Sequence, residues 1–257
     1  MLNFRNTNIF FGALLLALIG VHIKYGLPVY IYPLLFIVYS LVVFYGCYYV
    51  GSNFFIKVFC SAKTDRREIA ISFDDGPATN YTPEILQLLK QDNIKATFFC
   101  IGNRIAGNES IVKQIKDEGH VIGNHSYSHH FWFDMYSAKK MLGDLKMMDQ
   151  EMERVTGMRP KLFRPPYGVT NPNLKKAIIK GGYTPVGWSV RSMDTVIKDE
   201  KKLFGKIKAS LKPGAVFLFH DTQKITLDVL PGFIKEVKNS GYDIVPLDKL
   251  LHLKPYA

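Results

Sequence analysis

Glu68-Ile-Ala-Ile-Ser-Phe-Asp-Asp-Gly-Pro77 is the stretch that decides the fold. Its run 69–73 is short and apolar, as a buried strand is, and two carboxylates follow it at once. From here to the C-terminus, short apolar runs alternate with amphipathic segments, a pattern that favours parallel strands with helical crossovers. We therefore predict an α/β fold with a distorted or incomplete (β/α) barrel, and an open doubly wound sheet as the alternative.

The other expected elements follow from the same alternation. Gly119 and Gly241 come directly after amphipathic segments, as glycines that end helices do, and Pro83 suits a first helical turn. We expect strands at 69–73, 96–101, 120–122, 162–163, 184–190, 215–219 and 244–245, and helices at 83–91, 110–118, 138–156, 172–180, 202–211 and 227–240.

Two uncharged apolar runs, 9–23 and 29–50, precede this pattern. The second would reach about 33 Å as a helix, enough to cross a hydrocarbon core of roughly 30 Å. A signal peptide is the alternative for the first run, but no small-x-small cleavage pattern follows it. We expect residues 1–60 to form a transmembrane helical hairpin in contact with membrane lipid, followed by a polar linker at 61–67 and an α/β domain at 68–257.

The charge distribution predicts orientation and excludes one class of partner. The chain has 33 lysines and arginines against 22 aspartates and glutamates, a formal charge of +11. The lysines are scattered over several predicted helices without interleaved aromatic residues, which argues against nucleic-acid binding. No feature predicts an oligomeric state. The positive-inside rule favours an inner-membrane protein with its C-terminal domain in the cytoplasm, because Lys24 alone lies at the hairpin turn, against Arg5, Lys57, Lys63, Arg66 and Arg67 at the ends.

The polar residues best suited to chemistry stand directly after predicted strands. In a parallel barrel the carboxyl ends of the strands share one rim, where active sites assemble. We expect that rim to gather Asp74, Asp75, His125, His129, Arg164, Asp194 and His220.

His125-Ser-Tyr-Ser-His129 places two imidazoles four residues apart, on one side of a helical turn, which suits one metal ion. A chance pair is the alternative in a chain with seven histidines, and His130 is a competing ligand. Asp75 is the natural third ligand, because one aspartate and two histidines leave positions open for water and substrate. The plain alternative for 74–77 is a turn.

The remaining rim residues suit acid–base chemistry. Asp74 is free to act as general base on a water, and Arg164 is placed to keep it ionised and oriented. Phe163 and Pro165 beside Arg164 argue against a solvated surface arginine. His220, at the end of an apolar run, is the remaining group able to protonate a leaving nitrogen, with a satisfied core histidine as the alternative.

Four motifs, in order, resemble a known family. Ser72-Phe-Asp-Asp-Gly-Pro77, His125-Ser-Tyr-Ser-His129, Arg164-Pro-Pro-Tyr-Gly168 and Leu218-Phe-His-Asp221 look like the successive motifs of the polysaccharide deacetylases, the NodB-homology domain of carbohydrate esterase family four. The resemblance covers residues 67–250. It implies a distorted (β/α) barrel that hydrolyses N-acetyl groups of amino sugars in a polysaccharide, peptidoglycan or lipid-linked glycan.

The resemblance also implies site roles. It assigns one divalent metal ion, zinc first with cobalt, nickel or manganese as alternatives, to the aspartate and two histidines identified above. It agrees with the roles given above to Asp74 as base, Arg164 as the partner of that base, and His220 as acid. It alone assigns the backbone N–H of Tyr167 to the oxyanion, Asp194 to tuning the charge of His220, and Leu218 to the pocket for the acetyl methyl.

One motif departs from the family pattern. Where many members read Asp-x-x-Asp-Trp, this chain reads Arg191-Ser-Met-Asp194-Thr195. Arg191 then makes a different salt bridge or binds an anionic group of the substrate, so the departure bears on sugar preference.

Three other functions compete with this one. The first is a membrane-anchored carbohydrate-binding protein with a degenerate site, supported only by Arg191 and Thr195. The second is a deformylase or O-deacetylase acting on a lipid-linked sugar. A glycosidase is disfavoured, because it uses two carboxylates that flank the scissile bond, whereas Asp74 and Asp75 are neighbours in the chain.

Overall fold

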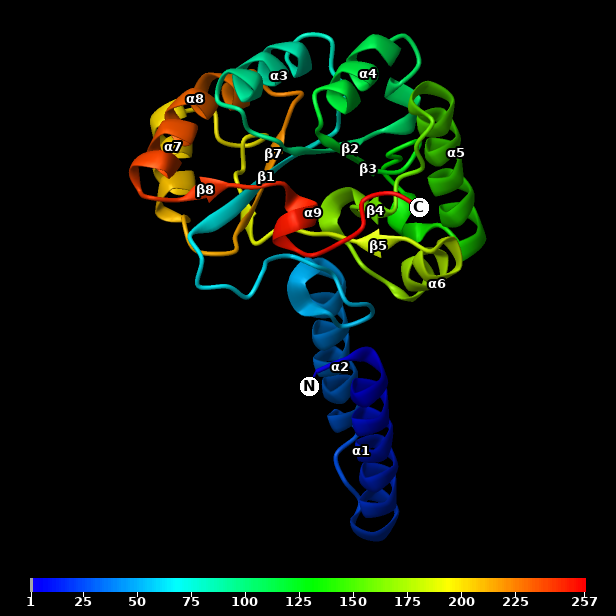
Figure 1. The fold of residues 1–257 in the computed structure, drawn as a ribbon. Helices are drawn as coiled ribbons and strands as arrows, with labels where there is room; N and C mark the ends of the chain where they lie inside the picture. Colours follow the sequence, from blue (N-terminus) through cyan, green and yellow to red (C-terminus); the bar gives the residue numbers. More distant parts are fainter. Residues whose placement is uncertain (1) are drawn as a thin grey trace.

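β1 (Glu68–Asp74) lies at the centre of a parallel sheet in the computed structural model, which describes residues 2–257 (Figure 1). The strand order is β5-β4-β3-β2-β1-β7-β6, and β8 pairs with the start of β1. The other strands are β2 (Thr97–Cys100), β3 (Val121–Asn124), β4 (Leu162–Phe163), β5 (Thr184–Pro185), β6 (Val190–Arg191), β7 (Val216–His220) and β8 (Asp243–Ile244).

Helices surround the sheet and run back between successive strands (Figure 1). Side-chain caps begin several of them, such as Ser137, which accepts a hydrogen bond from the backbone N–H of Lys140. The helices of the domain are α3 (Thr82–Gln91), α4 (Glu109–Asp117), α5 (Ala138–Thr156), α6 (Pro172–Gly181), α7 (Glu200–Ala209), α8 (Lys224–Asn239) and α9 (Leu247–Leu250).

The strand order is that of a (β/α) barrel opened at one place. β1 pairs with both β2 and β7, as the first and last strands of a closed ring do. Within residues 2–257 no pairing joins β5 to β6, although they are neighbours in the sequence. The single strand expected at 184–190 is therefore two strands, because Val186 between them bridges to Phe59 instead. The incomplete barrel is confirmed, and the doubly wound alternative was wrong.

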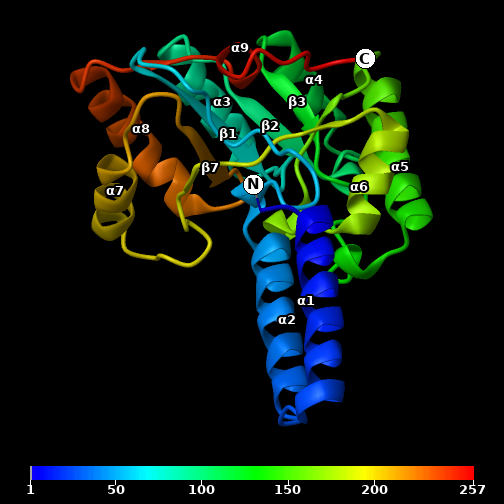
Figure 2. The ribbon, with the colours of Figure 1, turned by 90° about the horizontal axis from the view of Figure 1, so that it is seen from below.

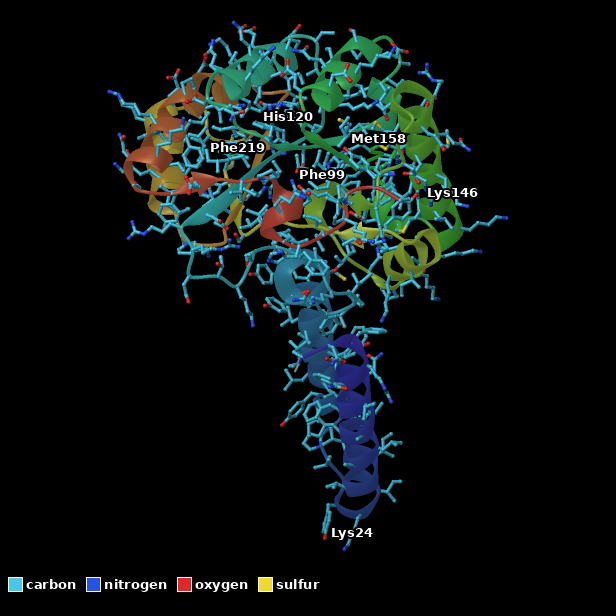
Figure 3. All side chains as sticks on the ribbon, viewed as in Figure 1. Lys24, Phe99, His120, Lys146, Met158 and Phe219 are labelled. Carbon is cyan, nitrogen blue, oxygen red and sulfur yellow. The ribbon has the colours of Figure 1, made fainter. Side chains whose placement is uncertain are left out.

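β1 is buried on both faces, which explains its apolar composition. Ile69, Ile71 and Phe73 face the helices and join the largest apolar cluster, with Phe219 of β7. The intervening positions face the inside of the curled sheet, where Phe99 lies (Figure 3). Side chains alternate between the two faces of a strand. Because Phe73 packs against the helices, the next residue, Asp74, points to the inside of the sheet.

Two helices, α1 (Phe4–Tyr25) and α2 (Ile31–Tyr48), form a hairpin that projects from the domain (Figures 1 and 2). Gly26 ends α1 in a left-handed conformation, and Lys24 lies at the far tip (Figure 3). Both helices are long and apolar enough to cross a membrane, and most of their large side chains are exposed. They are shifted from the predicted runs 9–23 and 29–50.

The segment between the hairpin and β1 packs on the domain over most of its length. Val50, Phe54, Phe55 and Val58 are buried. Near its end, Ala62 donates its backbone N–H to the carbonyl of Gly214 at 2.9 Å. The hairpin is thus joined to the domain by a packed apolar segment and not by a free linker.

Candidate active site

The strand register brings the predicted site residues to one edge of the sheet. Asp74, the last residue of β1, pairs with His220, the last residue of β7. Asn124 at the end of β3 pairs with Phe163, so His125 and Arg164 follow at the same level. A pocket of about 180 Å³ opens there, and it is lined by Asp74, Asp75, His125, His129, Pro165, Tyr167, Gly168, Trp188, Arg191, Thr195, Leu218 and His220.

The two aspartates separate because the chain turns between them. Asp75 has a left-handed backbone (φ 74), a conformation that aspartate tolerates better than most residues. Its Oδ1 atom lies 3.6 Å from Nε2 of His125 and 3.4 Å from Nε2 of His129. Asp74 is still part of β1, and its side chain faces the inside of the sheet. The two adjacent aspartates therefore have different surroundings.

The two histidines do not lie on a helical turn, so the reason given for their spacing was wrong. Ser126 (φ 65) and His129 (φ 43) have left-handed backbones, and the segment forms an irregular loop. Asp144 of α5 holds this loop by accepting the backbone N–H of Tyr127 at 2.7 Å. The imidazoles nevertheless converge, with ring centroids 4.9 Å apart.

The donor atoms suit a divalent metal ion. The Oδ1 atom of Asp75 is buried and has no hydrogen-bond donor within residues 2–257, and the ligand atoms of Asp75, His125 and His129 lie within 4.8 Å of one another. Nδ1 of His125 donates a hydrogen bond to the carbonyl of Arg164 at 2.8 Å. The lone pair of its Nε2 atom is therefore free to bind an ion. Burial, assisted by His125, lowers the pKa of His129 to about 4, so its ring is neutral, as a ligand must be.

Arg164 is wholly buried beside Asp74. Its Nη1 atom donates to Oδ1 of Asp74 at 2.7 Å and to Oγ of Ser72 at 2.9 Å, and Nη2 donates to the carbonyl of Gly187 at 2.8 Å. The guanidinium also lies 4.0 Å from the centre of the Phe99 ring. A buried charge needs such a full set of partners, and the hydrogen bond from Nη1 fixes the direction of the Asp74 carboxylate.

His220 is paired with a buried carboxylate. Its Nδ1 donates to Oδ1 of Asp194 at 2.7 Å, and its backbone N–H donates to Oδ2 at 2.7 Å. Burial alone would lower the pKa of His220, but the hydrogen bond and charge of Asp194 outweigh it and raise the pKa. Nε2 of His220 is therefore directed by Asp194, in a site that favours the protonated ring.

The remaining predicted residues complete the pocket wall. Leu218 is almost fully buried beneath it, and Tyr167 has a left-handed backbone (φ 57) at its rim. The ring of Tyr167 meets that of His129 edge-on at 4.8 Å. His130 stays outside the cluster of ligand atoms, since its Nδ1 accepts the backbone N–H of Trp132.

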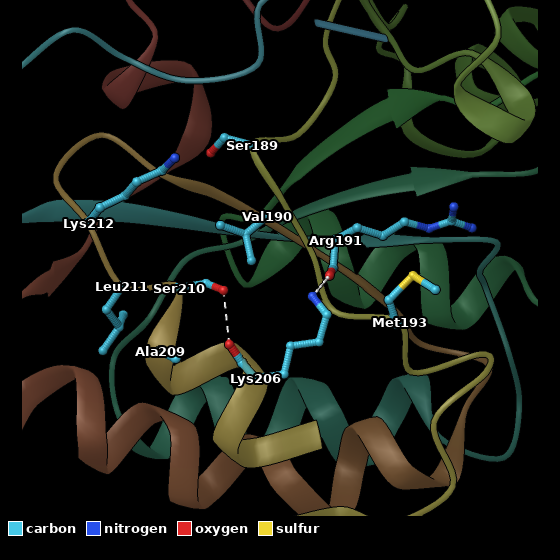
Figure 4. Close-up of a pocket in the computed structure, with 9 residues that line it drawn as sticks. All are labelled: Ser189, Val190, Arg191, Met193, Lys206, Ala209, Ser210, Leu211 and Lys212. Atoms are coloured by element: carbon cyan, nitrogen blue, oxygen red, sulfur yellow. Dashed lines mark hydrogen bonds between the residues drawn. The ribbon is translucent and has the colours of Figure 1, made fainter. Parts of the chain in front are cut away.

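Arg191 also lines a second cavity of about 730 Å³ (Figure 4). This cavity is larger than the first, but none of the predicted metal ligands or acid–base residues lines it. Nζ of Lys206 donates to the carbonyl of Arg191 at 2.6 Å, and the guanidinium is turned away from that lysine (Figure 4). The cations around the cavity therefore do not converge, and Arg191 lines the smaller pocket as well.

Sequence reasoning missed residues that support the site from behind. Thr226 donates to Oδ2 of Asp194 at 2.6 Å, and nothing in the sequence pairs the two. Asp221 was visible in the fourth motif but had no assigned role. It is buried against Gly76, where an added Cβ would lie 2.1 Å from its Oδ2, and Thr82 donates to it at 2.6 Å. This packing explains why the turn after Asp75 needs glycine.

Comparisons with known proteins agree with this geometry. The family model described as polysaccharide deacetylase matches residues 61–186. Peptidoglycan-N-acetylglucosamine deacetylase PgdA of Listeria monocytogenes is 33% identical over 202 residues, covering 79% of this chain and 42% of PgdA. The chain thus spans less than half the length of that relative.

Two further relatives are covered more fully. Peptidoglycan-N-acetylmuramic acid deacetylase PdaA of Bacillus subtilis is 31% identical over 219 residues, covering 84% of this chain and 79% of PdaA. The crystal structure of the Bc1960 peptidoglycan N-acetylglucosamine deacetylase matches with a TM-score of 0.74 and 32% identity, covering 78% of this chain and 95% of that one. The chain belongs to the polysaccharide deacetylase family.

Proposed function

We propose that this chain is a metal-dependent deacetylase that hydrolyses N-acetyl groups of amino sugars in a polysaccharide, peptidoglycan or lipid-linked glycan. The observation that carries the proposal is the unpartnered Oδ1 of Asp75, facing two imidazole Nε2 atoms with Asp74 and His220 in the same pocket. The names of the three relatives reported above, each a peptidoglycan deacetylase, support the substrate class.

Asp75, His125 and His129 hold the metal ion, and we take it to be zinc, because two imidazoles and one carboxylate are typical of catalytic zinc; cobalt, nickel and manganese are the alternatives. When bound, the ion polarises the amide carbonyl and acidifies a water molecule. The other steps belong to the chain's own residues.

Asp74, oriented by Arg164, accepts a proton from the attacking water. The backbone N–H of Tyr167 donates to the developing oxyanion, and Leu218 contacts the acetyl methyl. His220, oriented by Asp194, protonates the amine nitrogen as the carbon–nitrogen bond breaks. That proton is needed because an amide anion is a very poor leaving group.

Acyl-group release tests the proposed function. Full-length protein loaded with zinc is incubated with N-acetylglucosamine oligomers, muramic acid-containing fragments, and N-formyl and O-acetyl analogues, and released acid is measured. Acetate from the N-acetyl sugars is expected. Release from only the formyl or O-acetyl compounds would replace the proposal with the corresponding activity, and no release from any of them would favour a carbohydrate-binding protein.

Arg191 bears on which amino sugar is preferred. Its side chain is exposed at the pocket, and within residues 2–257 no carboxylate pairs with its guanidinium. An unpaired guanidinium binds carboxylates through two parallel hydrogen bonds. We therefore assign Arg191 to substrate binding and expect sugars that carry a carboxylate to be deacetylated with a higher kcat/KM than neutral ones in the same panel.

His220→Ala is expected to lower kcat by about 10² to 10⁴ with little change in KM, because the proton donor is lost. The raised pKa of His220 means that the wild type keeps its acid to a higher pH than an ordinary histidine, so activity falls only as pH rises through that value. Rate measurements across pH should show this alkaline fall in the wild type and not in the variant. An unchanged kcat would remove His220 from the mechanism.

Membrane insertion is part of the proposal. The length and apolar exposure of α1 and α2 support two spans, and the cations at the open end of the hairpin support a cytoplasmic domain in the inner membrane. A reporter fused after Ala257 is expected to be active only in the cytoplasm. A reporter active only outside would reverse the orientation.

A further inference from the structure

The hairpin is attached to the side of the domain that carries the pocket. Thr170 donates its backbone N–H to the carbonyl of Cys47 at 3.0 Å and its hydroxyl to the carbonyl of Gly46 at 3.2 Å, both near the end of α2. Thr170 comes three residues after Tyr167, which lines the pocket. The end of the second helix and the rim of the site are thus in direct contact through one short segment.

The loop between β3 and α5 lies beside this attachment. Nδ2 of Asn171 donates to the carbonyl of Asp134 at 2.8 Å, and the ring of Phe131 lies 6.4 Å from that of Tyr167. Figure 2 shows the green loop before α5 and the yellow loop before α7 on the same side of the domain from which the hairpin projects. A bilayer that contains the hairpin would therefore face these loops.

The loop presents large apolar side chains to the outside. Phe131, Trp132 and Met135 are 70%, 58% and 76% exposed, and the first two rings pack edge-on at 4.8 Å. Exposed clusters of this kind mark a contact surface, and tryptophan is enriched where a membrane meets water. We call these three residues the apolar loop.

Cations surround the same junction. A cavity of about 530 Å³ lies where α1 and the segment after α2 meet α6, and its charged lining residues are Arg5, Lys57, Lys175 and Lys176. It contains no acidic residue. Basic side chains next to a membrane span attract anionic lipid headgroups, at about 1 kcal/mol for each lysine or arginine. The basic residues suit the anionic headgroup layer of a bilayer, and the apolar loop suits the acyl chains beneath it.

We propose that the face carrying the catalytic pocket rests on the bilayer, with the apolar loop inserted among the lipids. The substrate is then an amino sugar presented at the membrane surface on a lipid carrier, and not a distant strand of polymer. This substrate assignment rests on the proposed deacetylase function, whereas the contact of the apolar loop with lipid does not.

Tryptophan fluorescence tests the contact directly, since the chain has only two tryptophans. Full-length protein is placed in nanodiscs of phosphatidylcholine and phosphatidylglycerol with normal or brominated acyl chains. Bromine is expected to quench the wild-type emission, and Trp132→Phe is expected to lose that quenching. As a matched control, Trp132→Phe combined with Met147→Trp moves the indole to another exposed apolar position, midway along α5, and should be unquenched. Equal quenching of wild type and Trp132→Phe, or none, would overturn the contact.

Activity tests the substrate assignment. Phe131→Ser, Trp132→Ser and Met135→Ser combined are expected to raise KM several-fold for N-acetylglucosaminyl phosphoprenol in nanodiscs, with no change for soluble N-acetylglucosamine oligomers. Equal kinetics of the variant and the wild type on the lipid-linked sugar would overturn the lipid-carrier assignment. Failure of the wild type on every sugar would instead refute the deacetylase function, with the fluorescence result still standing.

Discussion

Asp75→Ala is expected to abolish both metal binding and acetate release while leaving the fold intact. The variant removes the buried oxygen that lies 3.6 and 3.4 Å from the two imidazole nitrogens. The ion supplies several kcal/mol of stabilisation to the transition state, so the rate should fall by about three orders of magnitude or more. Zinc content by mass spectrometry and circular dichroism measure binding and fold separately from activity.

Two companion variants make this result specific. Asp75→Asn keeps a residue that tolerates the left-handed backbone but removes the charge, so it should also lose the ion without added strain. Asp65→Ala removes an exposed carboxylate ahead of β1 and should keep both zinc and activity. One equivalent of zinc retained by Asp75→Ala, or full turnover after treatment with a chelator, would contradict the metal assignment.

Arg164→Met is expected to lower the free energy of unfolding by about 3 to 5 kcal/mol, because it strands a buried carboxylate without its counter-charge. Asp74 would also lose the hydrogen bond that orients it, so the variant that folds should lose most of its activity. Denaturant unfolding in mild detergent measures the first effect, and acetate release measures the second. Because the arginine touches Ser72, Asp74, Val186 and Gly187, no single contact explains the loss.

Two further arginine variants serve as controls for the Arg164→Met measurement. Arg66→Met removes a surface ion pair with Glu68 and should cost only about 0 to 1 kcal/mol. Arg164→Lys keeps the charge but not the forked geometry, so it should be more stable than Arg164→Met and slower than the wild type. A fully active Arg164→Met protein would exclude a role for Arg164 in holding Asp74.

The positions of the site residues along the sheet were predictable because they depend on local pattern. Each apolar run ended at a polar residue, and parallel strands bring their carboxyl ends to one rim. Asp74 and His220 lie at that edge, where the structure also shows them as cross-strand neighbours. The residues that brace them, such as Thr226 behind Asp194, come from distant helices and carry no local signal.

Two features were not predictable because they depend on tertiary context. The histidine spacing fits a helix as well as a loop, and the loop is held by contacts such as those with Asp144 and with the carbonyl of Arg164. The apolar run 29–50 likewise does not reveal that Val50 is covered by protein while Phe44 is exposed. Burial by lipid and burial by a domain favour the same side chains, so the end of α2 had to come from the structure.

The apolar segment that joins the hairpin to the sheet sets where the polypeptide can be shortened for work without detergent. Deleting everything before Ser61 would uncover the surface now covered by Phe54, Phe55 and Val58, and would also leave the backbone N–H of Thr170 without its acceptor. Starting at Val50 retains the covering side chains. A truncation for crystallisation should therefore begin between α2 and Val50, and it would lose both acceptors of Thr170, the carbonyls of Gly46 and Cys47.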